Sequence, residues 1–240
     1  MVRAVLAAAL CGYLGVYVLL RRVVFVGAAL TQISGAGIAL AFYLASFHGS
    51  GEPHHGADSL WHSPVVYSLA ASVLGAVLFS FYREGVRLSS ETIVGLGWII
   101  AAAGVLFILS SKRIVQEAHE VDDLLYGSAV LVSTADVWVL FLVTAAILLL
   151  HVLFYKPFIF VTYDGEMART LGYHTRWWDM ALYATFGVGI SFAVRTVGAL
   201  PTFAFLIVPA AAATLLVRRI VWAFPLAVLF AVAGGTLLKA

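Results

Sequence analysis

Eight long apolar runs divide the chain, and short polar segments separate them. The runs cover approximately residues 4–20, 24–47, 64–82, 92–111, 137–155, 179–196, 202–217 and 220–238. Their lengths fall in or near the range of roughly 17–25 residues that a helix needs to cross a bilayer. Each run should be helical, because backbone amides find no water in the hydrocarbon core. The pattern predicts an all-α polytopic membrane protein with about eight transmembrane helices in one bundle.

Composition agrees with a membrane protein. The 240 residues are 63% hydrophobic and only 11% charged, whereas a soluble domain is about 45–50% apolar and about 25% charged. We interpret residues 1–240 as a single transmembrane domain. The net charge of +2 is spread over the ends of the runs, which argues against nucleic acid binding. Cys11 is the only cysteine, so an intrachain disulfide and a thiolate zinc cluster are excluded.

The lysines and arginines predict an orientation. The first run follows Arg3 and ends at Arg21 and Arg22 without a convincing cleavage site, which favours a spanning helix over a signal peptide. The segments 21–23, 83–91, 156–178 and 218–219 hold nine of the 14 positive residues and are therefore expected in the cytoplasm. Residues 48–63 and 112–136 would face outward, and an interfacial or partly re-entrant helix is expected near 124–132.

Catalytic machinery is not apparent in the sequence. The chain contains no Gly-x-x-x-x-Gly-Lys-Ser/Thr motif, so any ATP must be bound by another chain. Ionisable residues in or beside the runs lie near their ends, where snorkelling and capping are common; these are Glu91, His151, Asp179 and Arg195. No acid pair or histidine–acid relay is expected at the midplane, and no catalytic residue is assigned.

The outer segment 48–63 is rich in histidine. Its four histidines lie within fifteen residues, beside Glu52 and Asp58; they are His48, His54, His55 and His62. Neutral imidazole is a common ligand of zinc, and carboxylates can complete such a site. The segment is either a transient metal-collecting site or a solvated loop that happens to contain histidines.

A compact polar insert, "VTYDGEMARTLGYHTRWW", interrupts the apolar pattern at residues 161–178. Asp164 can cap a short helix with Glu166 in its first turn, and Gly172 is well placed at its C-terminal end. Met167, Ala168 and Leu171 are expected on one side of this helix. That side is either a docking surface for a partner or packs back onto the bundle.

Several segments together resemble one family, the membrane permeases of ABC importers for zinc, manganese or ferrous iron. The similar segments, in chain order, are "GVYVLLRRVVFVGAAL", "SSETIVGLGWIIAAAGVLFI", "DDLLYGSAVLVSTAD", "TYDGEMARTLG" and "TVGALPTFAFLIVPAAAATLL". The fourth is similar to the family's Asp-Pro-Glu-x-Ala-x-x-x-Gly signature, with Gly165 in place of proline. The fifth carries Gly198, Pro209 and Ala210 at the family's positions.

The resemblance implies a permease in a prokaryotic plasma (inner) membrane that binds no cofactor of its own. Its implied partners are a second permease copy, two cytoplasmic ATPase subunits that bind ATP, and an external solute-binding protein that delivers the metal. It also implies that one set of residues couples the spans to the ATPase: Asp164, Gly165, Glu166, Met167, Ala168, Arg169, Leu171 and Gly172.

The sequence departs from the family pattern on the second run. Ala28 and Gln32 stand where the family has an aspartate and a histidine that contact the metal, and these positions with Thr31 are expected to face the translocation path. The chain also ends at Ala240, directly after an apolar run, where members usually continue.

The expected function is import of a divalent transition metal. Zinc is favoured by the histidines, because manganese prefers oxygen ligands. The alternative is a secondary transporter or channel for a small cation that works without ATP.

Overall fold

The computed structural model describes residues 2–47, 64–81, 89–110 and 134–237. Within these ranges every regular element is a helix. The helices are α1 (Val2–Leu20), α2 (Phe25–Phe47), α3 (Pro64–Phe81), α4 (Ser90–Leu109), α6 (Thr134–Leu153), α7 (Tyr155–Tyr163), α8 (Gly165–Thr170), α9 (Thr175–Val197), α10 (Ala199–Leu216) and α11 (Ile220–Leu237). The histidine-rich segment and the expected interfacial helix near 124–132 lie outside the described residues.

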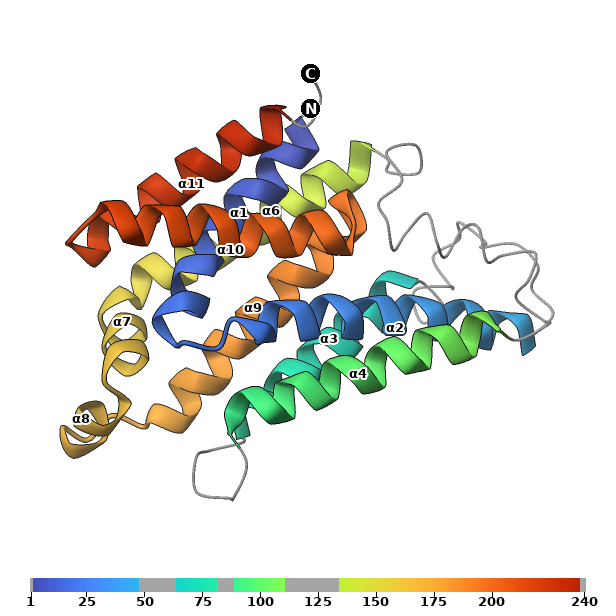
Figure 1. Cartoon of the computed structure of the whole chain (residues 1–240), viewed down its shortest axis with the longest axis horizontal. Helices are drawn as coiled ribbons and strands as arrows, with labels where there is room; N and C mark the ends of the chain where they lie inside the picture. Colours follow the sequence, from blue (N-terminus) through green and yellow to red (C-terminus); the bar gives the residue numbers. More distant parts are fainter. Residues whose placement is uncertain (1, 48–63, 82–88, 111–133, 238–240) are drawn as a thin grey trace.

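All eight predicted runs form helices, with ends within four residues of those expected. Six helices are long and apolar enough to span a membrane, and α6 and α7 together make a seventh, bent span; in α11 the apolar stretch Ile220–Thr236 is slightly shorter. Figure 1 shows that the chain runs back and forth between two sides. The end of α1, the beginning of α4, α8 and the α10–α11 turn lie toward the left and lower left, as the predicted cytoplasmic segments should if they share one face.

The polar insert is more regular than expected. We predicted one short capped helix within the cytoplasmic segment 156–178, but the structure forms both α7 and α8 there and begins α9 at Thr175. α7 forms because the segment 158–163, directly after Pro157, is apolar enough to pack against the bundle. Phe158 and Val161 are buried at 1% and 4% exposure. The short helix is therefore confirmed as α8, whereas α7 and the early start of α9 were not expected.

A bend of 78° separates α6 from α7. Pro157 lacks an amide hydrogen, so it cannot donate to the carbonyl of Leu153, and its ring clashes with that carbonyl in a continuous helix. α6 therefore ends at Leu153, and Pro157 is tolerated in the first turn of α7. The proline thus turns the chain at the end of α6.

Two groups of helices form the bundle. α1 packs against α10 and α11, α2 packs against α3 and α4, and α9 contacts α1, α2 and α3 and so joins the groups. Figure 1 shows α9 crossing between them. α1 and α10 approach so closely that a Cβ atom at Gly15 would lie 1.8 Å from the carbonyl oxygen of Leu206. Small residues allow this kind of backbone contact between membrane helices.

Buried serines connect the second group to α9. Ser68 on α3 shares hydrogen bonds with Ser34 of α2, at 2.7 Å, and with Ser191 of α9, at 2.9 Å. Ser72 donates to the carbonyl of Gly187 at 2.9 Å. These four serines are at most 2% exposed, so their hydroxyls depend on partners from neighbouring helices.

Replacing Ser68 by alanine should lower stability, because Ser34 and Ser191 would lose a shared partner. Interhelical hydrogen bonds in membranes contribute about 0.6 kcal/mol on average and up to about 1.7 kcal/mol, so we expect a loss of about 1–2 kcal/mol. Thermal unfolding in detergent measures this change. Ser80→Ala is the matched control, because Ser80 is also buried but bonds only to Val77 of its own helix. Equal unfolding temperatures for the two variants would contradict the prediction.

Candidate functional site

Helix α8 has a well-defined beginning. The carboxylate of Asp164 accepts a hydrogen bond from the amide of Met167 at 2.9 Å, as an N-cap residue does. Glu166 lies in the first turn, where the helix dipole favours a negative charge. The capping predicted from the sequence is confirmed.

The end of α8 is equally well defined. Gly172 has a φ of +85°, and its amide donates to the carbonyl of Arg169. The amide of Tyr173 reaches back to Ala168, which completes a Schellman motif. Glycine suits this left-handed position because it has no Cβ. The six-residue helix is therefore closed at both ends by its own sequence.

The two faces of α8 differ in burial. Met167 and Leu171 are 56% and 63% exposed, whereas Ala168 is fully buried. The prediction that these three residues share one side was wrong for Ala168, because successive helical residues are about 100° apart while residues four apart lie on one face. Tyr163 and Trp177, which flank α8 in the sequence, are also exposed, at 72% and 69%. The structure thus presents apolar side chains of α8 to the outside.

An aromatic cluster attaches α7, which directly precedes α8, to the bundle. The ring of Phe158 on α7 lies 5.3 Å from Trp178 of α9 and 4.7 Å from His151 of α6. His151 is fully buried and contacts Tyr17 of α1 and the hydroxyl of Thr185, the latter at 3.1 Å. The expectation that His151 snorkels was therefore wrong. Because α8 packs against α7, displacement of α8 would act on α1, α6 and α9 by way of α7 and these contacts.

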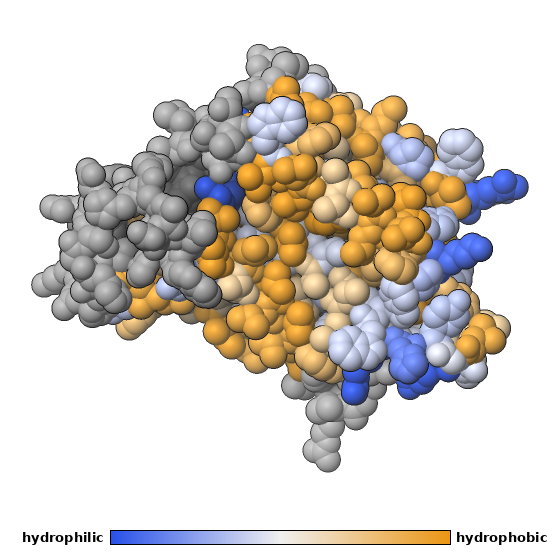
Figure 2. All heavy atoms as spheres, turned by 180° about the vertical axis from the view of Figure 1, so that it is seen from behind, coloured by the Kyte–Doolittle hydropathy of each residue, from blue (hydrophilic) through white to orange (hydrophobic). Residues whose placement is uncertain are grey.

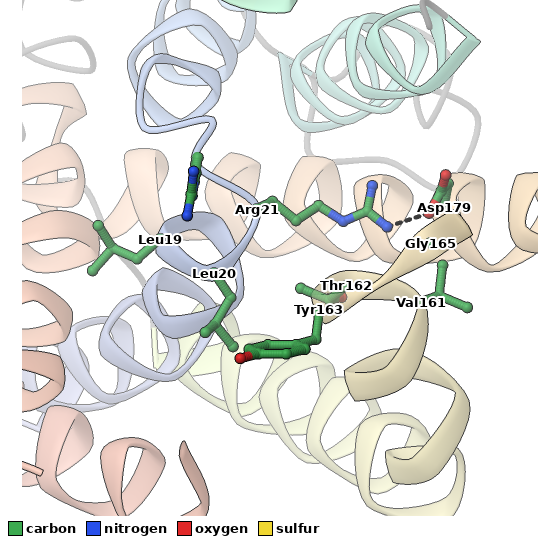
Figure 3. Close-up of a pocket in the computed structure, with 9 residues that line it drawn as sticks. Leu19, Leu20, Arg21, Val161, Thr162, Tyr163, Gly165 and Asp179 are labelled. Carbon is green, nitrogen blue, oxygen red and sulfur yellow. Dashed lines mark hydrogen bonds and ion pairs between the residues drawn. The ribbon is translucent and has the colours of Figure 1, made fainter. Parts of the chain in front are cut away.

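A pocket of about 690 Å³ lies beside the N-terminus of α8. Its walls come from the end of α1, the end of α7, the beginning of α8 and α9; they include Leu19, Leu20, Arg21, Arg22, Thr162, Tyr163 and Asp179. Arg21 forms an ion pair with Asp179 and lies 5.6 Å from the ring centre of Tyr183. Figure 3 shows Arg21 extending to Asp179, with Thr162 and Tyr163 below it. Asp179 was expected to cap or snorkel at a helix end, but it binds a residue 158 positions away.

The turn from α1 to α2 has unusual backbone geometry. Arg22 has a φ of +57°, and the amides of Arg22 and Val23 bond to the carbonyls of Leu19 and Val18. This is the same Schellman motif that ends α8, but with arginine in the place of glycine. A left-handed conformation costs a residue with a Cβ about 1–2 kcal/mol.

The expected path residues lie on adjacent faces of α2. Ala28 and Gln32, four residues apart, are both half-buried. Thr31 is 3% exposed, and its hydroxyl donates to the carbonyl of Ala28 at 2.8 Å. The role of this stretch in translocation stays a prediction.

No group of three or more histidine, cysteine, aspartate or glutamate side chains is placed to bind a metal within the ranges that the structure describes. His48, His54, His55 and His62 lie outside those ranges, so their metal-collecting role also stays a prediction.

The surface is that of a protein embedded in lipid. Figure 2 shows a broad apolar face, with hydrophilic residues gathered mostly at the right-hand edge, the side that carries α8 in this view. The exposed large side chains on α4 and α6 include Leu106, Phe107, Trp138 and Leu149. An apolar belt, spanning helices and a capped helix at one end define a polytopic membrane protein.

The sequence comparison gives the family. The model of the ABC 3 transport family matches residues 1–238, so the chain belongs to that family. This agrees with the resemblance found in the sequence.

Two of the similar proteins have names that refer to manganese transport. A manganese transport system membrane protein, MntC, of Halalkalibacterium halodurans is 25% identical over 95% of this chain and 72% of its own length. A manganese import system permease protein, ScaB, of Streptococcus parasanguinis is 24% identical over 90% of this chain and 70% of its own length.

Two solved structures share the fold. The PsaBC complex of Streptococcus pneumoniae with a Fab superposes with a TM-score of 0.76 at 21% identity, over 97% of this chain and 77% of that one. An inward-facing conformation of a putative metal-chelate type ABC transporter gives 0.67 at 16% identity, over 98% and 74%.

Proposed function

We propose that this chain is the permease subunit of a binding-protein-dependent ABC importer for a divalent transition metal. The carrying observation is the exposed apolar face of α8 in a polytopic member of the ABC 3 family. Met167 and Leu171 would each contribute roughly 1.5–3 kcal/mol if a partner buried them. That partner is a cytoplasmic ATPase subunit, which supplies the nucleotide site that the sequence lacks.

The remaining assembly follows from the same proposal. A second permease copy lies beside the first in the inner membrane of a prokaryote, and an external solute-binding protein delivers the ion. The chain itself performs no covalent chemistry and binds no cofactor; the metal is its substrate.

The path for the ion runs along α2 in this proposal. Ala28 provides no ligand and Gln32 provides only a neutral amide oxygen, so the helix holds the ion weakly as it passes. If α2 binds the ion weakly, ion selectivity depends more on the outer histidines and on the solute-binding protein. The relatives' names support manganese, whereas the histidine-rich segment supports zinc.

The proposal predicts ATP-dependent uptake of manganese or zinc. The chain would be purified from its native membrane with its ATPase, reconstituted in vesicles and supplied with the solute-binding protein. Uptake of each radioactive ion is then measured alone and in competition with the other. We expect uptake to require both ATP and the solute-binding protein. Equal uptake without ATP would instead support the secondary transporter or channel and would overturn the proposal.

A further inference from the structure

The pocket between the α1–α2 turn and the α7–α8 joint carries an excess of positive charge. Arg21 and Arg22 are both in its wall, and Asp179 is its acidic residue. Asp179 is bound to Arg21, so its charge is balanced. Arg22 is exposed and has no ion-pair partner within the described part of the chain. The pocket therefore has a net charge of one positive unit and suits a singly charged anion.

Two hydrogen-bond donors in the pocket wall lack acceptors. The hydroxyl of Thr162 is buried without a partner, and Thr162 as a whole is 8% exposed. Other helical threonines bond back to their own helix, as Thr144 does to Leu140 at 2.7 Å. The Nε of Arg21 is likewise buried and unpartnered. Buried polar groups normally have partners, so these donors indicate a missing acceptor.

Arg22 occupies a backbone position that would suit glycine better. Its φ of +57° corresponds to that of Gly172 at the end of α8, and the two turns have the same hydrogen-bond pattern. An arginine therefore stands where the fold alone favours a residue without a side chain. The turn itself does not need this side chain, so we attribute the arginine to binding of a ligand by its guanidinium.

The pocket lies at the level expected for lipid headgroups. α1 ends at Leu20 and α2 begins at Phe25, so the turn between these two spans marks the edge of the apolar core. Leu19, Leu20 and Tyr163 add apolar surface beside the charged groups. A phosphodiester has one negative charge and oxygens that only accept, which complements one excess arginine and unpartnered donors.

We propose that this pocket binds the phosphodiester headgroup of an anionic membrane phospholipid. Arg22 supplies the charge, the side chains of Thr162 and Arg21 turn their unpartnered donors toward the headgroup, and Leu19 and Leu20 contact the glycerol and the first acyl carbons. Such a lipid would join the α1–α2 turn to the segment that carries α8.

The test uses the full chain in detergent, mixed with equal amounts of phosphatidylglycerol and phosphatidylcholine. Native mass spectrometry counts the retained lipids, and thermal unfolding is followed in the same samples. The wild type should retain phosphatidylglycerol preferentially, and its unfolding temperature should rise with that lipid. Arg22→Gly should lower phosphatidylglycerol retention about tenfold, because the lipid loses a charged partner. Thr162→Val should lower it about fivefold, because the lipid loses a neutral hydrogen-bond donor.

Both variants are expected to weaken lipid binding without destabilising the lipid-free protein. Glycine suits the backbone at position 22, and valine removes an unpartnered hydroxyl with little change in shape, so neither should unfold at a lower temperature without lipid. Arg219→Gly is the matched control, because Arg219 is also an exposed arginine in a turn between spans. This control should retain phosphatidylglycerol as the wild type does.

Three results would overturn the assignment. Arg22→Gly could retain the lipid unchanged, and loss of the ATPase in the same variant would then place Arg22 in a protein contact. Arg219→Gly could lose the lipid as much as Arg22→Gly does, which would indicate diffuse attraction to the surface. Inorganic phosphate could displace the lipid and stabilise the chain as well, which would indicate a site for a free anion.

Discussion

Met167→Asp should abolish ATP-driven uptake and leave the protein folded in the membrane. Met167 is 56% exposed, so the carboxylate is solvated in the free permease and costs little there. It also lies in the first turn of α8, where a negative charge is favourable. Burying an unpaired carboxylate against the ATPase costs several kcal/mol, and each 1.4 kcal/mol weakens association about tenfold. Association should therefore fall by more than about a hundredfold.

Co-purification of the ATPase, its hydrolysis rate and uptake in vesicles measure this effect. Met167→Leu keeps an apolar side chain and is the control, which should couple normally. Leu171→Asp tests the same face at a second exposed position and should behave like Met167→Asp. If Met167→Asp retained both the ATPase and transport-linked hydrolysis, α8 would not be the docking element.

Gly15→Ala should prevent the bundle from assembling. The added Cβ would lie 1.8 Å from the carbonyl oxygen of Leu206 and 3.0 Å from the Cβ of Ala210. The first of these is a backbone atom, so a rotamer change cannot relieve the clash and α1 must move away from α10. Because α1 contributes many of the fully buried residues, we expect a loss of at least about 4 kcal/mol.

Gly104→Ala on α4 is the matched control. A Cβ at Gly104 has no neighbour within 4 Å in the described structure, and alanine is the better helix former by about 1 kcal/mol. Size-exclusion chromatography and thermal unfolding in detergent should show Gly15→Ala aggregated and Gly104→Ala folded. A monodisperse Gly15→Ala with the wild-type unfolding temperature would show that α1 and α10 are not in such close contact.

The sequence was most informative about features that depend only on residues close together in the chain. Hydrophobic runs predicted the helices because the bilayer sets both their length and their composition. Asp164 and Gly172 predicted the ends of α8 because capping depends on residues within one turn. Neither inference required knowledge of which helices are neighbours.

The missed features depend on long-range contacts. Arg21 and Asp179 are 158 residues apart and each resembles an ordinary charge at a helix end, so their pairing was not visible in the pattern. The burial of Ala168 depends on how α8 lies against its neighbours, and the pocket depends on the 78° bend. Pro157 after Lys156 was a local signal for that bend, because a proline near the end of an apolar run commonly breaks a helix.

The packing of α1 has a consequence for the biogenesis of the protein. α10 and α11, two of the helices that α1 packs against most closely, are translated well after α1, because the other described helices lie between them in the chain. Until residues 199–237 have been translated and inserted, Gly12 and Gly15 of α1 lack the neighbours on α10 and α11 that they contact in the bundle. Such non-local contacts make folding slow, because chain entropy is lost before they form. The insertion of the α10–α11 pair, rather than that of the spans before it, should therefore determine when this part of a nascent chain becomes compact.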